Sequence, residues 1–261
     1  MQARRAGVWA ALAIVVLYFA LQFGLGILIG AVVGLAAKLK AGLAAAPAHS
    51  VPPTTKSIVA AIQASPDLRV IVVVLTLTAT AAVTAWLVHR LWPAQWTGAG
   101  LPGFGFTRLA NPRAYLVAVL LGIVVLLLGG PLTQFLAGQH PIRQDVTLLA
   151  GSVSPGLRVL LALVVVGVAP FAEELVFRGV LLSGLARRMP IGWAVLASAV
   201  IFGCAHLPDF GFAWYPVPVL ILLGLIAAWL RVRTHSLWPS IALHATNNAV
   251  AAVAWFVVAH R

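Results

Sequence analysis

Long apolar runs follow one another along the chain, separated by short stretches that gather the charged residues, prolines and glycines. A helix needs about 20 apolar residues to cross the hydrocarbon core of a bilayer. Runs of this kind predict membrane-spanning helices, and we count seven. The predicted spans are Gly7–Ala37, Val70–Val88, Ala114–Ala137, Leu157–Arg187 with an interruption at Pro170, Ile191–His206, Trp214–Leu230 and Trp238–Ala259.

The composition points to the same class of protein. Hydrophobic residues make up 62% of the 261 positions, charged residues only 8%, and the mean hydropathy is +1.05. A soluble domain carries about 25% charged residues, so this chain cannot cover a water-facing surface. The sequence predicts an all-α, polytopic transmembrane helix bundle of about seven spans, within a range of six to eight. It excludes a soluble enzyme, a disulfide-rich secreted scaffold and a disordered protein.

Polar stretches divide the chain into two predicted parts. Residues 1–150 are predicted to form about three N-terminal transmembrane helices, and residues 151–261 to form the part that carries the chemistry. Within the first part, residues 38–68 are the most polar stretch of the chain. They predict an exposed loop with a short interfacial helix near Ser57–Ala64.

Seventeen Lys and Arg against five Asp and Glu give the chain a net charge of +12. The basic residues lie singly or in pairs at the ends of apolar runs, where they meet lipid headgroups. We therefore predict the lipid bilayer as a partner and no nucleic acid. Nine Lys and Arg, Arg231 and Arg233 among them, fall on the side of the N-terminus against seven on the other. This bias favours a cytoplasmic N-terminus.

Two adjacent carboxylates lie in the middle of the fourth predicted span. Glu173 is about 21–23 Å from either end of that span at 1.5 Å per residue, so it lies at membrane depth. Ionisable residues there cost several kcal/mol and are candidates for function. Arg178 follows Glu174 by four residues, so these two can pair on one helical face. Glu173 then points about 100° away and is free to face a cavity.

Two histidines also lie within apolar sequence. His206 follows Phe202 by four residues and His244 precedes Asn248 by four, so each pair shares a helical face. Two imidazoles and a carboxylate can hold Zn²⁺ with an open position for water. The same groups can form a metal-free site in which Glu is the base and His or Asn stabilise a developing oxyanion. Both alternatives remain open from the residues alone.

The order of these residues resembles a known family. Glu173-Glu174-x3-Arg178, Phe202-x3-His206 and His244-x3-Asn248 match the EExxxR, FxxxH and HxxxN pattern of the CAAX prenyl-protease and bacteriocin-processing (CPBP, or Abi) intramembrane proteases. The resemblance covers about residues 157–255 and identifies residues 151–261 as a CPBP protease core. It implies an endopeptidase that hydrolyses a membrane-associated protein or peptide, and we predict a bacterial inner (plasma) membrane as its location.

The resemblance also implies roles for the six residues. Glu173 activates water with help from His206, Glu174 and Arg178 support the site as a pair, and His244 and Asn248 bind metal or stabilise the oxyanion. A metal ion, if used, is expected to be zinc held by Glu173, His206 and His244. The chain lacks the HExxH motif of zincins, and asparagine is a poor zinc ligand. We therefore favour a glutamate mechanism with little or no metal dependence and keep zinc as the alternative.

Two other functions fit the same pattern. A non-catalytic immunity or maturation partner of this fold would keep the motifs and act by binding. A proton-coupled transporter would use the carboxylates and histidines as a relay, although the chain shows no internal repeat of the kind that transporters often carry. The predicted boundaries also create a conflict, because they place His206 and His244 near opposite membrane surfaces.

Overall fold

The computed structural model describes residues 5–44, 53–109, 111–140 and 144–257. Helices make up 82% of the described residues, and this part of the chain contains no strand. The predicted all-α bundle is therefore confirmed, and the protein is an integral, multi-pass membrane protein. The end predicted for the last span, Ala259, lies outside the described residues.

Six helices are long and apolar enough to cross a membrane in the described chain. They are α1 (Val8–Ala44), α3 (Pro66–Leu91), α5 (Arg113–Ala137), a composite helix over Pro155–Leu185, α11 (Val217–Thr234) and α12 (Trp238–Val257). The fifth predicted span forms α10 (Ile191–Ala205), which is 15 residues long. At 1.5 Å per residue it extends about 22 Å, which is shorter than the roughly 30 Å of a bilayer core.

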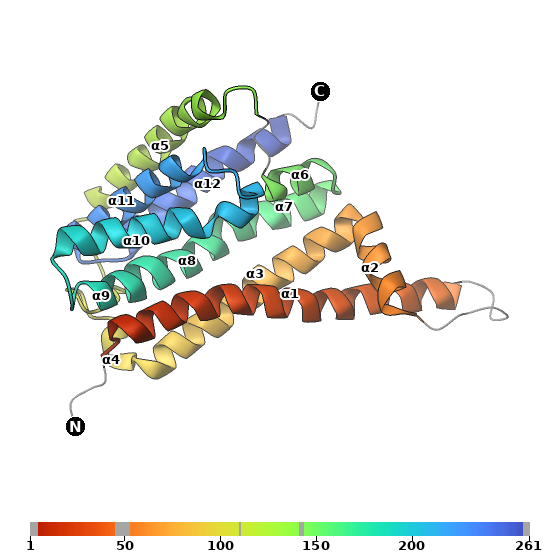
Figure 1. The fold of residues 1–261 in the computed structure, drawn as a ribbon, viewed down its shortest axis with the longest axis horizontal. Helices are drawn as coiled ribbons and strands as arrows, with labels where there is room; N and C mark the ends of the chain where they lie inside the picture. The colour runs from red at the N-terminus through yellow and green to blue at the C-terminus, as the bar shows by residue number, and fades with distance from the viewer. Residues whose placement is uncertain (1–4, 45–52, 110, 141–143, 258–261) are drawn as a thin grey trace.

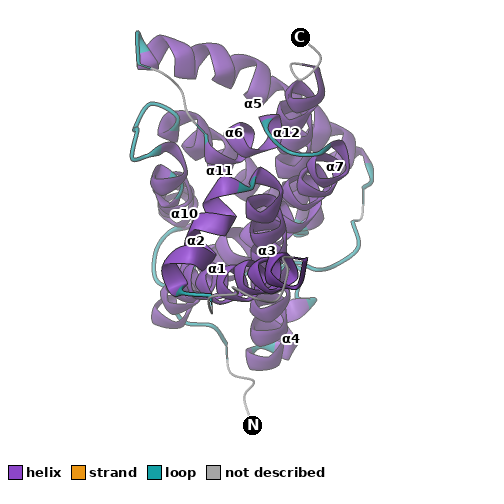
Figure 2. Cartoon of the chain, turned by 90° about the vertical axis from the view of Figure 1, so that its right-hand side faces the viewer, coloured by secondary structure: helices purple, strands orange, loops and turns teal. Residues whose placement is uncertain are grey.

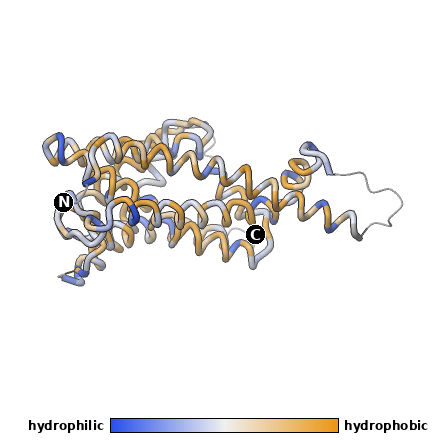
Figure 3. The backbone as a smooth tube through the Cα atoms, turned by 90° about the horizontal axis from the view of Figure 1, so that it is seen from below, coloured by the Kyte–Doolittle hydropathy of each residue, from blue (hydrophilic) through white to orange (hydrophobic). Residues whose placement is uncertain are grey.

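Short helices connect these elements. They are α2 (Thr55–Ala64), α4 (Pro93–Trp96), α6 (Asp145–Gly151) and the 3-10 helix η4 (Leu207–Phe210). The helix predicted near Ser57–Ala64 is thus present as α2, and Thr54 caps it by accepting a hydrogen bond from the backbone of Ser57. Figure 3 shows the far end of α1, with α2 beside it, projecting beyond the rest of the bundle. Residues 45–52 of the predicted loop lie outside the described part of the chain.

The composite helix remains helical through Pro170. It consists of α7 (Pro155–Leu163), the π-helix η2 (Val164–Val168), α8 (Ala169–Glu174), the π-helix η3 (Leu175–Leu181) and α9 (Leu182–Leu185). Proline has no N–H to continue an α-helical ladder, and η2 lies directly before it. The interruption predicted at Pro170 is therefore a π-helical segment and not a break in the chain path.

The helices pack in pairs around the composite helix. In Figure 1, α1 and α3 lie along one side of α8, and α10, α11, α12 and α5 lie on the other. Helix α10 packs on α11, α12 packs on α5 and α11, and α1 packs on α3 and η3. Viewed from the side in Figure 2, α5 lies farthest from α1. The composite helix is thereby enclosed by both parts of the chain.

The segment between α4 and α5, here called the inserted loop, enters the bundle with residues 103–105, which are buried. Phe104 is fully buried, and the Arg231 guanidinium donates hydrogen bonds to the carbonyls of Ala99 (2.9 Å) and Gly103 (2.6 Å). Arg231 is itself fully buried. The expectation that it lies among lipid headgroups is therefore wrong, because its charge is used to satisfy backbone carbonyls inside the bundle.

Candidate active site

Glu173 and the two histidines of the predicted site lie together inside the bundle. Glu173 Oε2 is 3.5 Å from His206 Nε2 and 3.8 Å from His244 Nε2. The three side chains come from α8, from the residue that follows α10, and from α12. Their exposed fractions are 15% for Glu173, 18% for His206 and 5% for His244. The carboxylate is therefore largely enclosed, and its Oε2 atom is buried.

Both imidazole rings are oriented by a hydrogen bond at Nδ1. His206 Nδ1 lies 2.8 Å from the carbonyl of Phe202, four residues earlier, and His244 Nδ1 lies 3.0 Å from Glu174 Oε1. A carbonyl or carboxylate oxygen only accepts, so Nδ1 carries the proton in both rings. Each Nε2 then faces Glu173 and is the atom that can bind a proton or a metal.

Glu174 turns away from Glu173 and links two parts of the site. Arg178 Nη1 donates to Glu174 Oε1 at 2.8 Å, and both side chains are fully buried. The pair predicted from the spacing of four is therefore confirmed. The same carboxylate oxygen accepts from His244. Arg178 thus offsets the charge of the carboxylate that fixes the orientation of His244.

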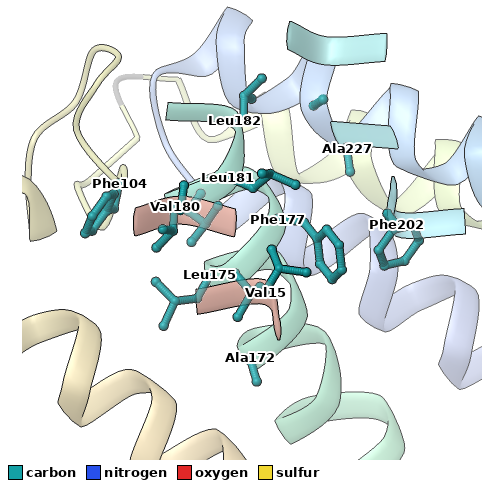
Figure 4. Close-up of a cluster of buried hydrophobic side chains, with 14 of the residues drawn as sticks. Val15, Phe104, Ala172, Leu175, Phe177, Val180, Leu181, Leu182, Phe202 and Ala227 are labelled. Atoms are coloured by element: carbon teal, nitrogen blue, oxygen red, sulfur yellow. The ribbon is translucent and has the colours of Figure 1, made fainter. Parts of the chain in front are cut away.

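Phe202 explains the aromatic position of the FxxxH motif. Its ring lies 4.2 Å from the Arg178 guanidinium carbon, and its centroid lies 4.6 Å from that of His206 and 5.6 Å from that of His244. Figure 4 shows it facing Phe177 within the apolar cluster. Phe202 therefore packs against both histidines and supplies the carbonyl for one of them. The FxxxH pattern includes this residue but does not indicate its role.

Asn248 makes its described contacts away from Glu173. Its Nδ2 donates to the carbonyl of Val165 at 3.0 Å, and its Oδ1 lies 3.4 Å from the amide of Asn247. Val165 belongs to η2, where the π-helical turn changes the pairing of backbone carbonyls. Asn248 thus joins α12 to the composite helix one turn from His244, and its predicted role in metal binding or oxyanion stabilisation remains a prediction.

The predicted conflict between the depths of the two histidines disappears in the structure. Helix α10 is short and ends beside Glu173, so His206 lies level with the middle of the composite helix. Helix α12 begins at the inserted loop, because Trp238 at its start contacts Phe106, and Phe106 also contacts Phe171 of α8. The predicted depths were counted from span ends that were taken to lie at a membrane surface. The contacts of α12 with the inserted loop show that this starting point does not hold for α12.

The residues present fit the donor chemistry of a zinc site in part. Two ligand atoms bound at about 2 Å to one tetrahedral zinc lie roughly 3–4 Å apart, which includes both distances from Glu173 to the histidines. Each imidazole also has the second hydrogen bond that zinc-binding histidines show. Within the described residues, however, no group of three or more His, Cys, Asp or Glu is arranged to hold a metal ion. The two distances from Glu173 thus agree with the ligand spacing around zinc, but the three residues together do not form a closed zinc site.

A known family model matches the part of the chain that carries the candidate site. Residues 155–250 match the family model described as type II CAAX prenyl endopeptidase Rce1-like. Comparison with curated proteins and with solved structures gives no match. The matched segment contains all three motifs and every residue of the candidate site, so the CPBP resemblance is confirmed there. Residues 1–154 lie outside the match.

Proposed function

Because residues 155–250 match the Rce1-like family of CAAX prenyl endopeptidases, we propose that this protein is an intramembrane endopeptidase whose base is Glu173. Its substrate is a membrane-associated protein or peptide whose scissile peptide bond lies next to the enclosed carboxylate. The observation that carries the proposal is the position of Glu173 Oε2. This buried oxygen has no hydrogen-bond partner in the described chain and faces two imidazole Nε2 atoms.

This geometry suits the activation of water. Glu173 takes a proton from a water molecule, whose oxygen then attacks the scissile carbonyl carbon and forms a tetrahedral intermediate. The C–N bond breaks when the leaving amine receives that proton from the Glu173 carboxyl group. His206 Nε2 lies 3.5 Å from Glu173 Oε2. From this position His206 stabilises the charge that moves between the carboxylate and the tetrahedral intermediate. Proton transfer of this kind contributes about 10²–10⁴-fold to a rate.

The supporting residues keep the two imidazoles ready for this step. Glu174 and the Phe202 carbonyl hold the Nδ1 protons, so that both Nε2 atoms stay directed at Glu173. Glu173, His206 and His244 are also the residues that would hold a zinc ion. Zinc would supply a more acidic bound water and would polarise the substrate carbonyl. The base, the orientation of the rings and the exclusion of bulk water come from the chain in either case.

The test uses purified protein and an internally quenched peptide that ends in a prenylated Cys-aliphatic-aliphatic-X sequence. Glu173→Gln keeps the shape of the side chain and removes the base, so we expect cleavage to fall by about 10²–10⁴-fold while the melting temperature stays unchanged. Asp145→Asn is the matched control, because Asp145 is an exposed carboxylate on α6. Wild-type cleavage by Glu173→Gln would refute the assignment of the base.

Two further measurements separate the remaining alternatives. Elemental analysis of the active protein distinguishes zinc from a metal-free water: one zinc per chain, lost together with activity on chelation, supports the three-residue zinc set. Comparative peptide analysis of membranes with wild-type or Glu173→Ala protein identifies natural substrates. A partner captured intact by both proteins, without a cleavage product from either, would instead support the non-catalytic immunity or maturation role.

A further inference from the structure

A cavity of about 480 Å³ lies where the beginning of α3 meets α6, outside the candidate active site. Four side chains line it: Arg69 from α3, and Asp145, Leu148 and Leu149 from α6. Pockets that bind small molecules have volumes of about 300–1,000 Å³. This cavity therefore has the size of a ligand site, and the motif residues are not among the four that line it.

The cavity is at one end of the bundle, at the depth of lipid headgroups. Helix α3 has 26 residues, so at 1.5 Å per residue it extends about 39 Å, and its ends pass beyond the roughly 30 Å hydrocarbon core. Arg69 is the fourth residue of this helix. Figure 1 shows α6 at the same end of the bundle as the start of α3. A molecule bound in the cavity is therefore level with the membrane surface.

The same end of the bundle is far from Glu173. Asp67 Oδ1 accepts a hydrogen bond from the backbone N–H of Ser154 at 2.9 Å, which brings the start of α3 level with the start of α7. Glu173 follows Ser154 by 19 residues on the composite helix, which is about 28 Å at 1.5 Å per residue. What binds in the cavity is therefore independent of the proposed cleavage.

Backbone contacts hold the walls of the cavity in place. Arg158 Nε donates to the carbonyl of Ala150 at 2.8 Å and its Nη2 to that of Val153 at 3.3 Å, which ties α6 to α7. Ala150 is fully buried, and α3 packs on both α6 and α7. The lining side chains thus come from elements that are fixed before a ligand binds, which lowers the cost of binding.

Arg69 and Asp145 bring opposite charges to the cavity without pairing. No ion pair joins them among the described residues, and the buried Nε of Arg69 has no hydrogen-bond partner there. A buried donor without an acceptor destabilises a fold. The Asp145 carboxylate is exposed and can only accept hydrogen bonds. The cavity therefore offers one group for an anion and one for a cation.

The two leucines give the cavity an apolar side. Leu148 is 60% exposed, and Leu149 packs against the apolar cluster that includes Val70 and Trp255. Apolar surface at the edge of a membrane-crossing bundle is favourable to cover with hydrocarbon. The lining thus suits a ligand that joins a doubly charged head to apolar chains.

We infer that this cavity binds the head of a phospholipid that carries both a phosphate and a primary ammonium group. The Arg69 guanidinium donates to the phosphate oxygens, for which its planar fork is well suited. The ammonium group donates to the Asp145 carboxylate, and the acyl chains lie over Leu148 and Leu149. A phosphate without an ammonium would leave Asp145 beside an anion, and a quaternary ammonium has no N–H to donate. The lipid is bound unchanged and links α3 to α6 at the membrane surface.

The test titrates full-length, delipidated protein in detergent with three lipids of identical acyl chains and counts bound lipid by native mass spectrometry. The lipids are phosphatidylethanolamine, phosphatidylcholine and phosphatidylglycerol. We expect phosphatidylethanolamine to bind about tenfold more tightly than the other two, because one more hydrogen bond between charged groups changes affinity by about this factor.

Two variants separate the roles of the two charges. Arg69→Gln should weaken phosphatidylethanolamine and phosphatidylcholine alike by about tenfold, because both lose the phosphate contact. Asp145→Asn should lower the affinity for phosphatidylethanolamine to that for phosphatidylcholine and leave the latter unchanged. Arg113→Gln is the matched control, since Arg113 is an exposed arginine at the start of α5, and it should keep the wild-type affinities.

Thermal unfolding supplies a second readout. Phosphatidylethanolamine should raise the melting temperature of the wild type, because a ligand that binds the folded state stabilises it, and this increase should be lost in Arg69→Gln. Without lipid the two proteins should melt together, because the buried Nε of Arg69 has no partner in the described chain to lose. A lower affinity of the variant is then not a folding defect.

Three results would overturn the inference: equal binding of the three lipids by the wild type, a preference for phosphatidylglycerol, or an unchanged affinity of Arg69→Gln for phosphatidylethanolamine. Soluble glycerophosphoethanolamine tests the head without its chains and should bind at least about tenfold more weakly than the lipid, because it buries no hydrocarbon. Equal binding of this compound and the lipid would show a site for a free headgroup and would overturn the lipid assignment.

Discussion

Helix α3 and the composite helix of residues 155–185 have the same mean hydropathy, 2.2, in their most apolar windows. Their buried polar residues differ in kind. In α3 these are Thr76, Thr80 and Thr84, which are neutral and have no hydrogen-bond partner in the described chain. In the composite helix they include Glu174 and Arg178, which are paired, fully buried and connected to His244. Average hydropathy thus identifies both as membrane-crossing, while the charge and pairing of a few side chains show which helix carries a site.

The largest effect in this comparison is expected at Arg178. Arg178→Met leaves the carboxylate of Glu174 buried without its partner, and breaking a buried ion pair costs about 3–5 kcal/mol. We expect a lower yield, a lower melting temperature in detergent and loss of cleavage. The measurement is thermal unfolding of the purified protein together with its activity on the quenched peptide.

The double variant Arg178→Met with Glu174→Gln is the control for this prediction. It removes both charges and keeps an oxygen that can accept from His244, so the melting temperature should return most of the way to the wild-type value. If Arg178→Met were instead as stable as the wild type but inactive, Arg178 would contact the substrate or the transition state directly.

The sequence predicted the helical fold and brought out Glu173, His206 and His244, which the structure places together in the candidate site, because these features depend on local patterns. Runs of apolar residues show where helices cross, and the spacing of four between Glu174 and Arg178 shows that they share a face. It could not predict the burial of Arg231, because the carbonyls that surround Arg231 belong to residues more than 120 positions earlier. The same inserted loop sets the depth of α12, so the depth of His244 could not be predicted from the length of a span.

A medium effect is expected where the N-terminal part supports the site. In α5, a Cβ atom at Gly122 would lie 2.6 Å from the backbone oxygen of Leu243, the residue before His244. Backbone cannot move aside as a flexible side chain does, so Gly122→Ala should push α5 and α12 apart and cost about 1–3 kcal/mol. We expect a lower melting temperature and several-fold slower cleavage, because His244 moves relative to Glu173.

Gly130→Ala is the matched control on the same helix. A Cβ atom at Gly130 has no neighbouring atom within 4 Å, and alanine favours a helix over glycine by about 1 kcal/mol. Stability should therefore be kept or slightly raised, with normal cleavage. Equal effects of the two substitutions would show that the contact between Gly122 and Leu243 does not hold α12 in place.

The smallest effect is expected at Thr80. It tests whether the buried threonines of α3 stabilise the fold as the buried pair of the composite helix does. Thr80 is fully buried in α3, and its hydroxyl has no hydrogen-bond partner among the described residues. Thr80→Val keeps the branched shape and removes the hydroxyl. Leaving a buried polar group unpaired costs about 1–3 kcal/mol, so the substitution should leave the melting temperature unchanged or raise it slightly, with cleavage at the wild-type rate. A loss of more than about 1 kcal/mol would mean that the hydroxyl makes a stabilising hydrogen bond. In that case α3, like the composite helix, would use its buried polar groups in pairs, and the difference between the two helices would be one of charge alone.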